Sequence, residues 1–303
     1  MKKITPYICV ILLAIVYLVC SKATNLVSAT GLAESQAGHF ATAHTVAGGG
    51  YNKYHTSYSP VNHLFLRNIW EIGAYTYEQI EEPQIKQSSE IDPSKPMIAL
   101  TFDDGPGIHT ARILDLLEQY GARATFCIIG GFAEPRRGLV ARAFESGNEI
   151  IGHSWSHRSL TKLTSKEIKQ EIMDTHAAIE SIIGTAPKMY RVPYGAINDK
   201  VRQISKELGF SIIGWSVDPR DWELRDADLV YNAIMDSATD GAIVICHDTY
   251  ESTAEAIERI IPELITQGYQ LVTVSELFKH RNITLEPGEV YHRAAPTCQH
   301  ISP

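Results

Sequence analysis

The stretch MIALTFDDGPGIHTARILDLLEQYG, residues 97–121, joins an apolar run to an amphipathic segment through two adjacent aspartates and a Gly-Pro pair. Residues 97–102 have the length and apolar content of a buried strand. Residues 109–121 have apolar positions at helical spacing and end in glycine, which is typical of a helix and its end. A strand followed at once by a helix is the unit of parallel α/β folds. Asp103 and Asp104 would stand at the carboxyl end of that strand. Two adjacent like charges are unfavourable at the end of a buried strand unless they have a role there.

The same alternation continues along the chain and predicts a parallel α/β architecture of about seven strand–helix units. The regular alternation of strands and helices favours a closed or nearly closed barrel over an open doubly wound sheet. No glycine-rich phosphate loop follows the first strand, which disfavours nucleotide binding. The further predicted strands are 124–130, 149–153, 188–193, 210–216, 241–248 and a final strand and turn at 269–278, and the further predicted helices are 136–147, 165–184, 199–209, 226–238 and 252–268.

The N-terminal part predicts export. Two lysines precede an apolar run at residues 7–20, so residues 1–23 are interpreted as a signal peptide, cleaved after Ala23 or Ala29, or as an uncleaved membrane anchor. The protein is therefore expected to be secreted or extracytoplasmic, with membrane contact only through this segment. Residues 24–93 are expected to form an irregular extension, 94–280 the catalytic domain and 281–303 a C-terminal tail.

Composition limits the function further. The formal net charge of the 303-residue chain is −8, which argues against a nucleic-acid partner. Five cysteines do not form a disulfide framework, and Cys127 and Cys246 lie in apolar runs that predict small buried side chains. The oligomeric state is not encoded in any pattern that we recognise.

Polar side chains end five of the predicted strands. In parallel barrels the catalytic residues gather at the carboxyl ends of the strands, so these groups are expected to share one site. They are Asp103 with Asp104, His153, Arg191, the segment from Trp215 to Asp218 with Asp221 just beyond it, and His247.

His153 and His157 are four residues apart, and on a helical turn both imidazoles would face one cation. Two histidines and one carboxylate form a ligand set for a divalent transition metal. Asp103 or Asp104 would supply the carboxylate, and the other would act as general base towards water. Histidines on an ordinary surface turn are the alternative interpretation.

His247, alone at another strand end, suits a general acid. Asp218 or Asp221 would favour its charged form through a hydrogen bond, and Arg191 would pair with Asp103 and orient it. Ordinary salt bridges are the competing interpretation of these charged groups.

Pro193 stiffens the turn before Tyr194, whose backbone N–H could then face an oxyanion. Trp215 and Trp222 are either core residues or walls for a sugar face.

Five motifs resemble those of the polysaccharide deacetylases, carbohydrate esterase family 4, also called the NodB-like domain. The resemblance covers residues 94–280. It implies a distorted (β/α) barrel. The motifs are TFDDGP at 101–106, HSWSH at 153–157, RVPYG at 191–195, DPRDW at 218–222 and IVICHD at 243–248.

The resemblance also implies a role for each matching residue. One divalent metal, zinc or alternatively cobalt or another transition metal, would be held by Asp104, His153 and His157. Asp103 would be the base, His247 the acid, Arg191 the residue that orients Asp103, and Asp221 rather than Asp218 the residue that tunes His247. Substrate would contact Tyr194, which also supplies the oxyanion donor, together with Pro193, Trp222 and Ile245. The chain departs from the common pattern at Arg158, where proline often follows the second histidine, and at Cys127, where an aromatic residue is common.

These inferences together predict an enzyme that removes N-acetyl groups from N-acetylglucosamine residues of a cell-wall polysaccharide, with peptidoglycan as the first candidate. An O-acetyl xylan esterase and a chitin-oligomer deacetylase would use the same residues. A glycan-binding surface protein without activity is the alternative from another class, although no expected catalytic residue is missing.

Overall fold

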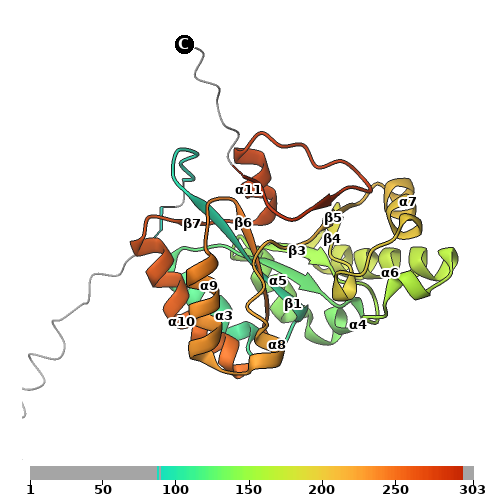
Figure 1. The fold of residues 1–303 in the computed structure, drawn as a ribbon. Coiled ribbons are helices and arrows are strands. Elements are labelled where there is room, and N and C mark those ends of the chain that lie inside the picture. The colour runs from blue at the N-terminus through green and yellow to red at the C-terminus, as the bar shows by residue number, and fades with distance from the viewer. Residues whose placement is uncertain (1–86, 89, 296–303) are drawn as a thin grey trace, which may run out of the picture. The chain divides into compact units, whose positions relative to one another are not determined.

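The computed structural model describes residues 87, 88 and 90–295 (Figure 1). The predicted signal peptide or anchor at 1–23, and nearly all of the predicted extension at 24–93, lie outside the described residues. Within the part that is described, no helix has both the length and the apolar content needed to cross a bilayer.

The described strands form one eight-stranded sheet in which neighbouring strands run parallel. Along the sheet their order is β6-β1-β2-β3-β4-β5-β8, and β7 pairs with the first residues of β1. The strands are β1 (Met97–Gly105), β2 (Thr125–Ile128), β3 (Glu149–Gly152), β4 (Met189–Tyr190), β5 (Ser211–Ile213), β6 (Ala242–His247), β7 (Gln270–Leu271) and β8 (Val290–Tyr291).

Isolated bridges connect the two ends of this sheet. Val217, just after β5, pairs with Val244 of β6, and Arg293, just after β8, pairs with Ala242. The Ile245 N–H donates to the Val217 carbonyl at 3.0 Å. The sheet therefore curls into an irregular barrel, which confirms the predicted fold class of a distorted (β/α) barrel.

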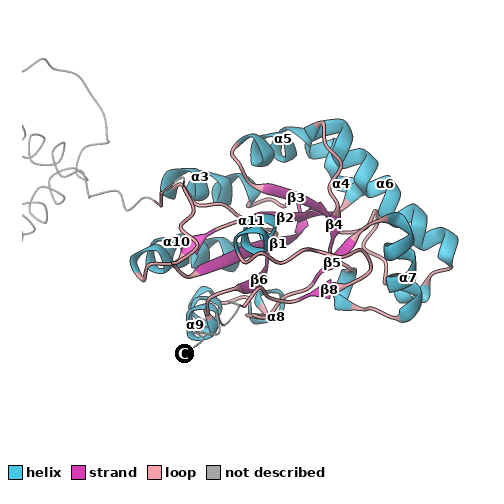
Figure 2. Cartoon of the chain, turned by 90° about the horizontal axis from the view of Figure 1, so that it is seen from above, coloured by secondary structure: helices cyan, strands magenta, loops and turns pink. Residues whose placement is uncertain are grey.

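Helices surround the curled sheet (Figure 2). Most of the longer ones follow a strand and return the chain to the start of the next strand, as parallel pairing requires. The helices are α3 (Thr110–Tyr120), α4 (Gly130–Ala133), α5 (Arg137–Glu145), α6 (Ser165–Ile183), α7 (Asp199–Leu208), α8 (Asp221–Leu224), α9 (Ala227–Ser237), α10 (Glu251–Thr266) and α11 (Val274–His280), with 3-10 turns at Glu134–Arg136, Leu160–Lys162 and Pro193–Gly195.

Side-chain alternation along β1 separates two cores. Ile98, Leu100 and Phe102 belong to the large cluster that includes residues of the surrounding helices, whereas Met97 and Ala99 belong to an inner cluster. Since successive strand residues point to opposite faces, Thr101 and Asp103 continue the inner row. The inner row is thus apolar at its start and polar at the carboxyl end of the strand.

The prediction of a final strand and turn at 269–278 was wrong in its second half. Only Gln270 and Leu271 are in a strand, and α11 begins at Val274. Thr273 and Glu276 form a capping box, in which each side chain accepts a hydrogen bond from the other residue's backbone N–H. The apolar residues that follow have helical spacing and pack into the inner cluster, so α11 covers the amino-terminal end of the barrel.

The predicted tail at 281–303 contains a strand of the barrel. Its residues Val290 and Tyr291 form β8, which pairs with β5, and the Gly214 N–H donates to the Tyr291 carbonyl at 2.8 Å. Two residues are too few for a strand to be recognised by alternation.

Candidate metal and catalytic site

Asp103 and Asp104 reach the same site through a bulge at the end of β1. Phe102 pairs with Phe126, but the next pair in the ladder joins Gly105 to Ile128, so β1 contains one extra residue. Asp103 points inward by strand alternation. Asp104 would point outward, but its left-handed backbone, with φ of 66°, lets its carboxylate join that of Asp103.

The two histidines come from a loop and not from the helical turn that we expected. His153 directly follows β3, and the loop turns back at Ser154 and His157, both of which have positive φ. The Ser154 hydroxyl accepts a hydrogen bond from the His157 N–H at 3.0 Å. Glu171 of α6, which is buried, accepts from the backbone N–H and the hydroxyl of Ser156 at 2.9 and 2.6 Å. These contacts bring both imidazoles to the same side.

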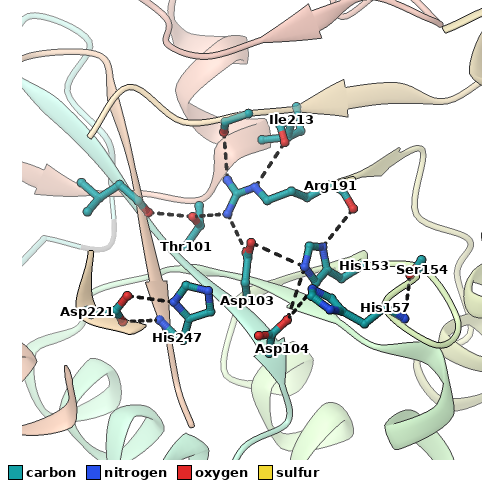
Figure 3. A network of polar contacts seen from close by, with 12 residues as sticks. Thr101, Asp103, Asp104, His153, Ser154, His157, Arg191, Ile213, Asp221 and His247 are labelled. Atoms are coloured by element: carbon teal, nitrogen blue, oxygen red, sulfur yellow. Dashed lines mark hydrogen bonds and ion pairs between the residues drawn. The ribbon is translucent and has the colours of Figure 1, made fainter. Parts of the chain in front are cut away.

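Asp104, His153 and His157 form a cluster whose potential ligand atoms all lie within 4.8 Å of one another (Figure 3). The Nε2 atoms of His157 and His153 lie 3.1 and 3.4 Å from Asp104 Oδ1. That oxygen is buried and, among the described residues, has no hydrogen-bond partner. A buried carboxylate oxygen without a hydrogen bond, facing two imidazole nitrogens, fits a divalent metal.

The protonation states also suit ligands. His153 Nδ1 donates to the Arg191 carbonyl at 2.9 Å, which leaves the lone pair of Nε2 directed at Asp104. Burial and the neighbouring His153 lower the pKa of His157 below its usual value and favour its neutral form. Burial would raise the pKa of Asp104, but the two histidines hold it below its ordinary value.

Asp103 is paired with Arg191, as the sequence suggested. The Arg191 guanidinium donates to Asp103 Oδ1 at 2.6 Å and is completely buried. Three further N–H groups donate to Thr101 Oγ1 and to the carbonyls of Ile213 and Gly214. Burial alone would raise the pKa of Asp103, yet the charges of Arg191 and the nearby histidines lower it. Asp103 is therefore a fixed, ionised carboxylate.

His247 is held by Asp221 and not by Asp218. Its Nδ1 donates to Asp221 Oδ1 at 2.8 Å, and its backbone N–H donates to Oδ2 at 2.7 Å. Thr253 of α10 also donates to Asp221, a partner that sequence reasoning missed. Burial alone would lower the pKa of His247, but the hydrogen bond and charge of Asp221 raise it to about 9. The carboxylate of Asp218 instead accepts from the Arg220 N–H.

The Pro193–Gly195 turn presents Tyr194 to the site. Tyr194 has φ of 61°, and its ring lies 4.6 Å from that of His157. No hydrogen bond from its backbone N–H to another described residue is present, so this donor can serve a ligand. Pro193 is buried beneath the turn; its side chain shapes the backbone and does not line the site.

These groups line one hollow of about 410 Å³. Trp222, Trp215 and Ile245 form apolar walls, and Trp222 is about half exposed. Tyr250 is a wall residue that the sequence did not suggest, because it follows His247 in a loop without a motif of its own. Lining the hollow are Asp103, Asp104, His153, His157, Tyr194, Trp215, Asp218, Trp222, Ile245, His247 and Tyr250.

Comparison with known proteins agrees with the family resemblance of the five motifs. A family model described as polysaccharide deacetylase matches residues 90–213. The peptidoglycan-N-acetylmuramic acid deacetylase PdaC of Bacillus subtilis is 41% identical over 194 residues, which are 64% of this chain and 41% of that protein. Its solved structure superimposes with a TM-score of 0.61 over 63% of this chain and 94% of the solved chain.

Two further relatives are covered almost completely. A peptidoglycan-N-acetylglucosamine deacetylase of Bacillus cereus is 36% identical over 207 residues, 66% of this chain and 97% of that protein. A family 4 acetyl xylan esterase from Clostridium thermocellum, solved with a cobalt ion, is 32% identical with a TM-score of 0.62 over 66% of this chain and 100% of the solved chain. By contrast, this chain spans less than half the length of PdaC.

Proposed function

Because the chain belongs to the polysaccharide deacetylase family, we propose that it hydrolyses N-acetyl groups on N-acetylglucosamine residues of peptidoglycan. One observation carries the proposal: a two-histidine, one-aspartate cluster lies beside a second carboxylate, with the imidazole of His247 in the same hollow. The relatives named as peptidoglycan deacetylases support the choice of polymer.

Asp104, His153 and His157 would hold one divalent metal, which we propose is zinc. When bound, that metal would supply a Lewis acid for the acetyl carbonyl. The cobalt ion of the related esterase supports a transition metal of this kind without deciding between cobalt and zinc.

Asp103 would act as the general base. Its pairing with Arg191 through Oδ1 keeps the carboxylate ionised, and Oδ2, which lies 3.7 Å from His153 Nε2, would take a proton from water. The water oxygen then attacks the acetyl carbon, and the Tyr194 N–H would donate to the carbonyl oxygen as it gains negative charge.

His247 would act as the general acid. With a pKa of about 9 it is protonated at neutral pH, and it can transfer that proton to the departing nitrogen. The C–N bond breaks and gives an amine on the sugar and acetic acid, which ionises to acetate as the amine takes up its proton. The proton that Asp103 takes from water balances the one that His247 gives. Trp222 and Ile245 would enclose the acetyl methyl group.

Two other substrates remain candidates for the same residues. The Bacillus subtilis relative is named for N-acetylmuramic acid, and the Clostridium thermocellum relative for acetyl xylan. An O-acetyl group has an easier leaving group than an amide, so the same base and acid would suffice.

The location is part of the proposal. Peptidoglycan lies outside the cytoplasmic membrane, so the protein would be secreted or held outside the membrane by residues 1–23. The divisions at residues 24–93 and 94–280 stay predictions of the sequence.

Acetate release by the purified protein tests the function. Peptidoglycan, chitin oligomers and acetylated xylan would be offered side by side, with and without added zinc or cobalt. Release from peptidoglycan that needs added metal, and that is lost in Asp104→Ala, is the expected result. Release from acetylated xylan alone would overturn the choice of substrate in favour of the esterase activity.

A further inference from the structure

A second hollow adjoins the catalytic one. It has a volume of about 620 Å³ and is lined by Arg158, Ser159, Lys162, Leu163 and Tyr194. Tyr194 lines both hollows, so they meet at this residue. A polymer that crosses the catalytic hollow can therefore extend into the second one.

We propose that the second hollow binds a carboxylate on a sugar of the substrate chain and so selects peptidoglycan over neutral glycans. The inference rests on the proposed function, because it requires a sugar polymer in the catalytic hollow. Alternate sugars of peptidoglycan carry a lactyl ether. Its carboxyl group is either free or joined to a stem peptide that has carboxylates of its own, whereas chitin oligomers carry none.

Among the residues that the structure describes, the charges around the second hollow leave one cation without an acidic partner. Arg158 lies 3.2 Å from Glu167 and 4.0 Å from Glu171, so its charge is shared with two carboxylates. Lys162 is exposed and, within residues 87–295, forms no ion pair with any carboxylate. A third cation, the Lys200 ammonium, donates to the Leu163 carbonyl at 2.5 Å beside the hollow. The summed formal charge of these three cations and two carboxylates is positive.

This positive region contrasts with the chain as a whole, whose formal net charge is −8. A general field of the protein would repel a polyanionic wall polymer, so attraction has to come from a local site. The exposed ring of Tyr194 adds an aromatic surface against which a sugar ring can pack. Charge and shape together suit an acidic sugar.

The cations do not belong to the motif shared with the family. Arg158 stands where proline commonly follows the second histidine, and Lys162 lies beyond the motif. Arg158 is unsuitable for a clean test, because its neighbour Glu171 holds Ser156 in the loop that carries His153 and His157. Lys162 has no such connection and is the position to change.

Turnover on matched oligomers tests the proposal. The metal-loaded protein and its Lys162→Ala and Lys162→Glu variants would be compared on N-acetylglucosamine oligomers, on peptidoglycan oligomers with free lactyl carboxylates, and on the same oligomers with stem peptides. Lys279→Glu on α11, at the opposite end of the barrel, is the matched control for a change of surface charge.

We expect kcat/KM on the carboxylated oligomers to fall about threefold to fivefold in Lys162→Ala, the upper part of the range of one exposed ion pair, and further in Lys162→Glu. Turnover of the neutral oligomers and all rates of Lys279→Glu should stay unchanged. A loss confined to oligomers with peptides would assign the carboxylate to the stem. A loss confined to oligomers with free lactyl groups would assign it to the lactyl group, and a loss on both would show that the hollow accepts either carboxylate.

Equal rates for Lys162→Glu and the unchanged protein on every oligomer would overturn the inference and leave the proposed function intact. Calorimetric binding of the carboxylated oligomers separates the two ideas further. If no substrate releases acetate, the proposed function fails, while binding that is weakened in Lys162→Glu still supports the carboxylate site. Binding equal in both proteins rejects the site as well.

Discussion

Asp103 and Asp104 are consecutive residues of one strand, yet both carboxylates enter the same hollow, because the left-handed backbone of Asp104 reverses the side that strand alternation would give it. Asp103 is turned to Arg191 and Asp104 to His153 and His157. The two adjacent carboxylates thus have different partners. Asp103 pairs with a guanidinium, and Asp104 faces two imidazoles.

Removal of a metal ligand should abolish metal binding before it affects folding. Loss of a residue that only supports a ligand typically costs about 10- to 100-fold in metal affinity, so Asp104→Ala should cost more than about 100-fold. Calorimetric titration with zinc measures this. Asp218→Asn changes a carboxylate of the same hollow that is not in the cluster, and it should bind zinc as the unchanged protein does. Equal affinities in all three proteins would exclude Asp104 as a ligand.

The role of Asp103 separates from metal binding. Asp103→Asn keeps the shape of the side chain and an acceptor for Arg191, but it removes the proton acceptor. We expect kcat to fall about 10²- to 10⁴-fold, the usual contribution of a positioned base, while zinc affinity changes little. Single-turnover acetate release and zinc titration on the same preparation measure both. Near-normal turnover would reject Asp103 as the base.

The pH profile should depend on Asp221. Burial lowers the pKa of His247 and Asp221 raises it to about 9, so kcat/KM should decline as pH rises through about 9, where the imidazolium loses its proton. Asp221→Asn should move this alkaline limb to lower pH. Thr253→Val removes one hydrogen bond to Asp221 but no charge, and should move it less. An alkaline limb at the same pH in Asp221→Asn would contradict the assignment of His247 as the acid.

The pair of His247 and Asp221 should also make the stability of the fold depend on pH. The pKa of His247 is raised on folding from its usual 6.5, so its interaction with Asp221 stabilises the fold fully below that value and is lost as pH rises through about 9. The pH dependence of unfolding should therefore flatten in Asp221→Asn over this window.

Arg191 should matter for stability as well as for activity. Arg191→Ala would leave Asp103 buried without its partner, and breaking a buried pair in this way costs about 3–5 kcal/mol in the free energy of unfolding. Urea unfolding measures the loss. Arg137→Ala breaks an exposed pair with Glu134 and should cost no more than about 1 kcal/mol. Equal losses in the two variants would show that the buried pair of Arg191 and Asp103 stabilises the fold no more than an exposed pair does.

The sequence by itself determined the architecture and the members of the site. Strand and helix periods are local properties, and they predicted the alternation of parallel strands and helices together with the strand ends that carry Asp103, His153, Arg191 and His247. The motifs placed Asp104, His157 and Asp221 among them. In the structure Asp103 pairs with Arg191, His247 with Asp221, and Asp104 faces both histidines. Metal ligation and the catalytic roles stay predictions.

Tertiary structure decided how those members are arranged. The bulge at Asp104 and the non-helical turn between His153 and His157 depend on contacts with other elements, such as that of Ser156 with Glu171. Strand ends alone left Asp218 and Asp221 both open, the family motif favoured Asp221, and the structure holds Asp221 of α8 against His247 of β6. The pairs that define the chemistry join residues far apart in sequence, 88 positions for Asp103 and Arg191 and 26 for Asp221 and His247. Local patterns contain no information about such distances, because folding alone brings these segments together.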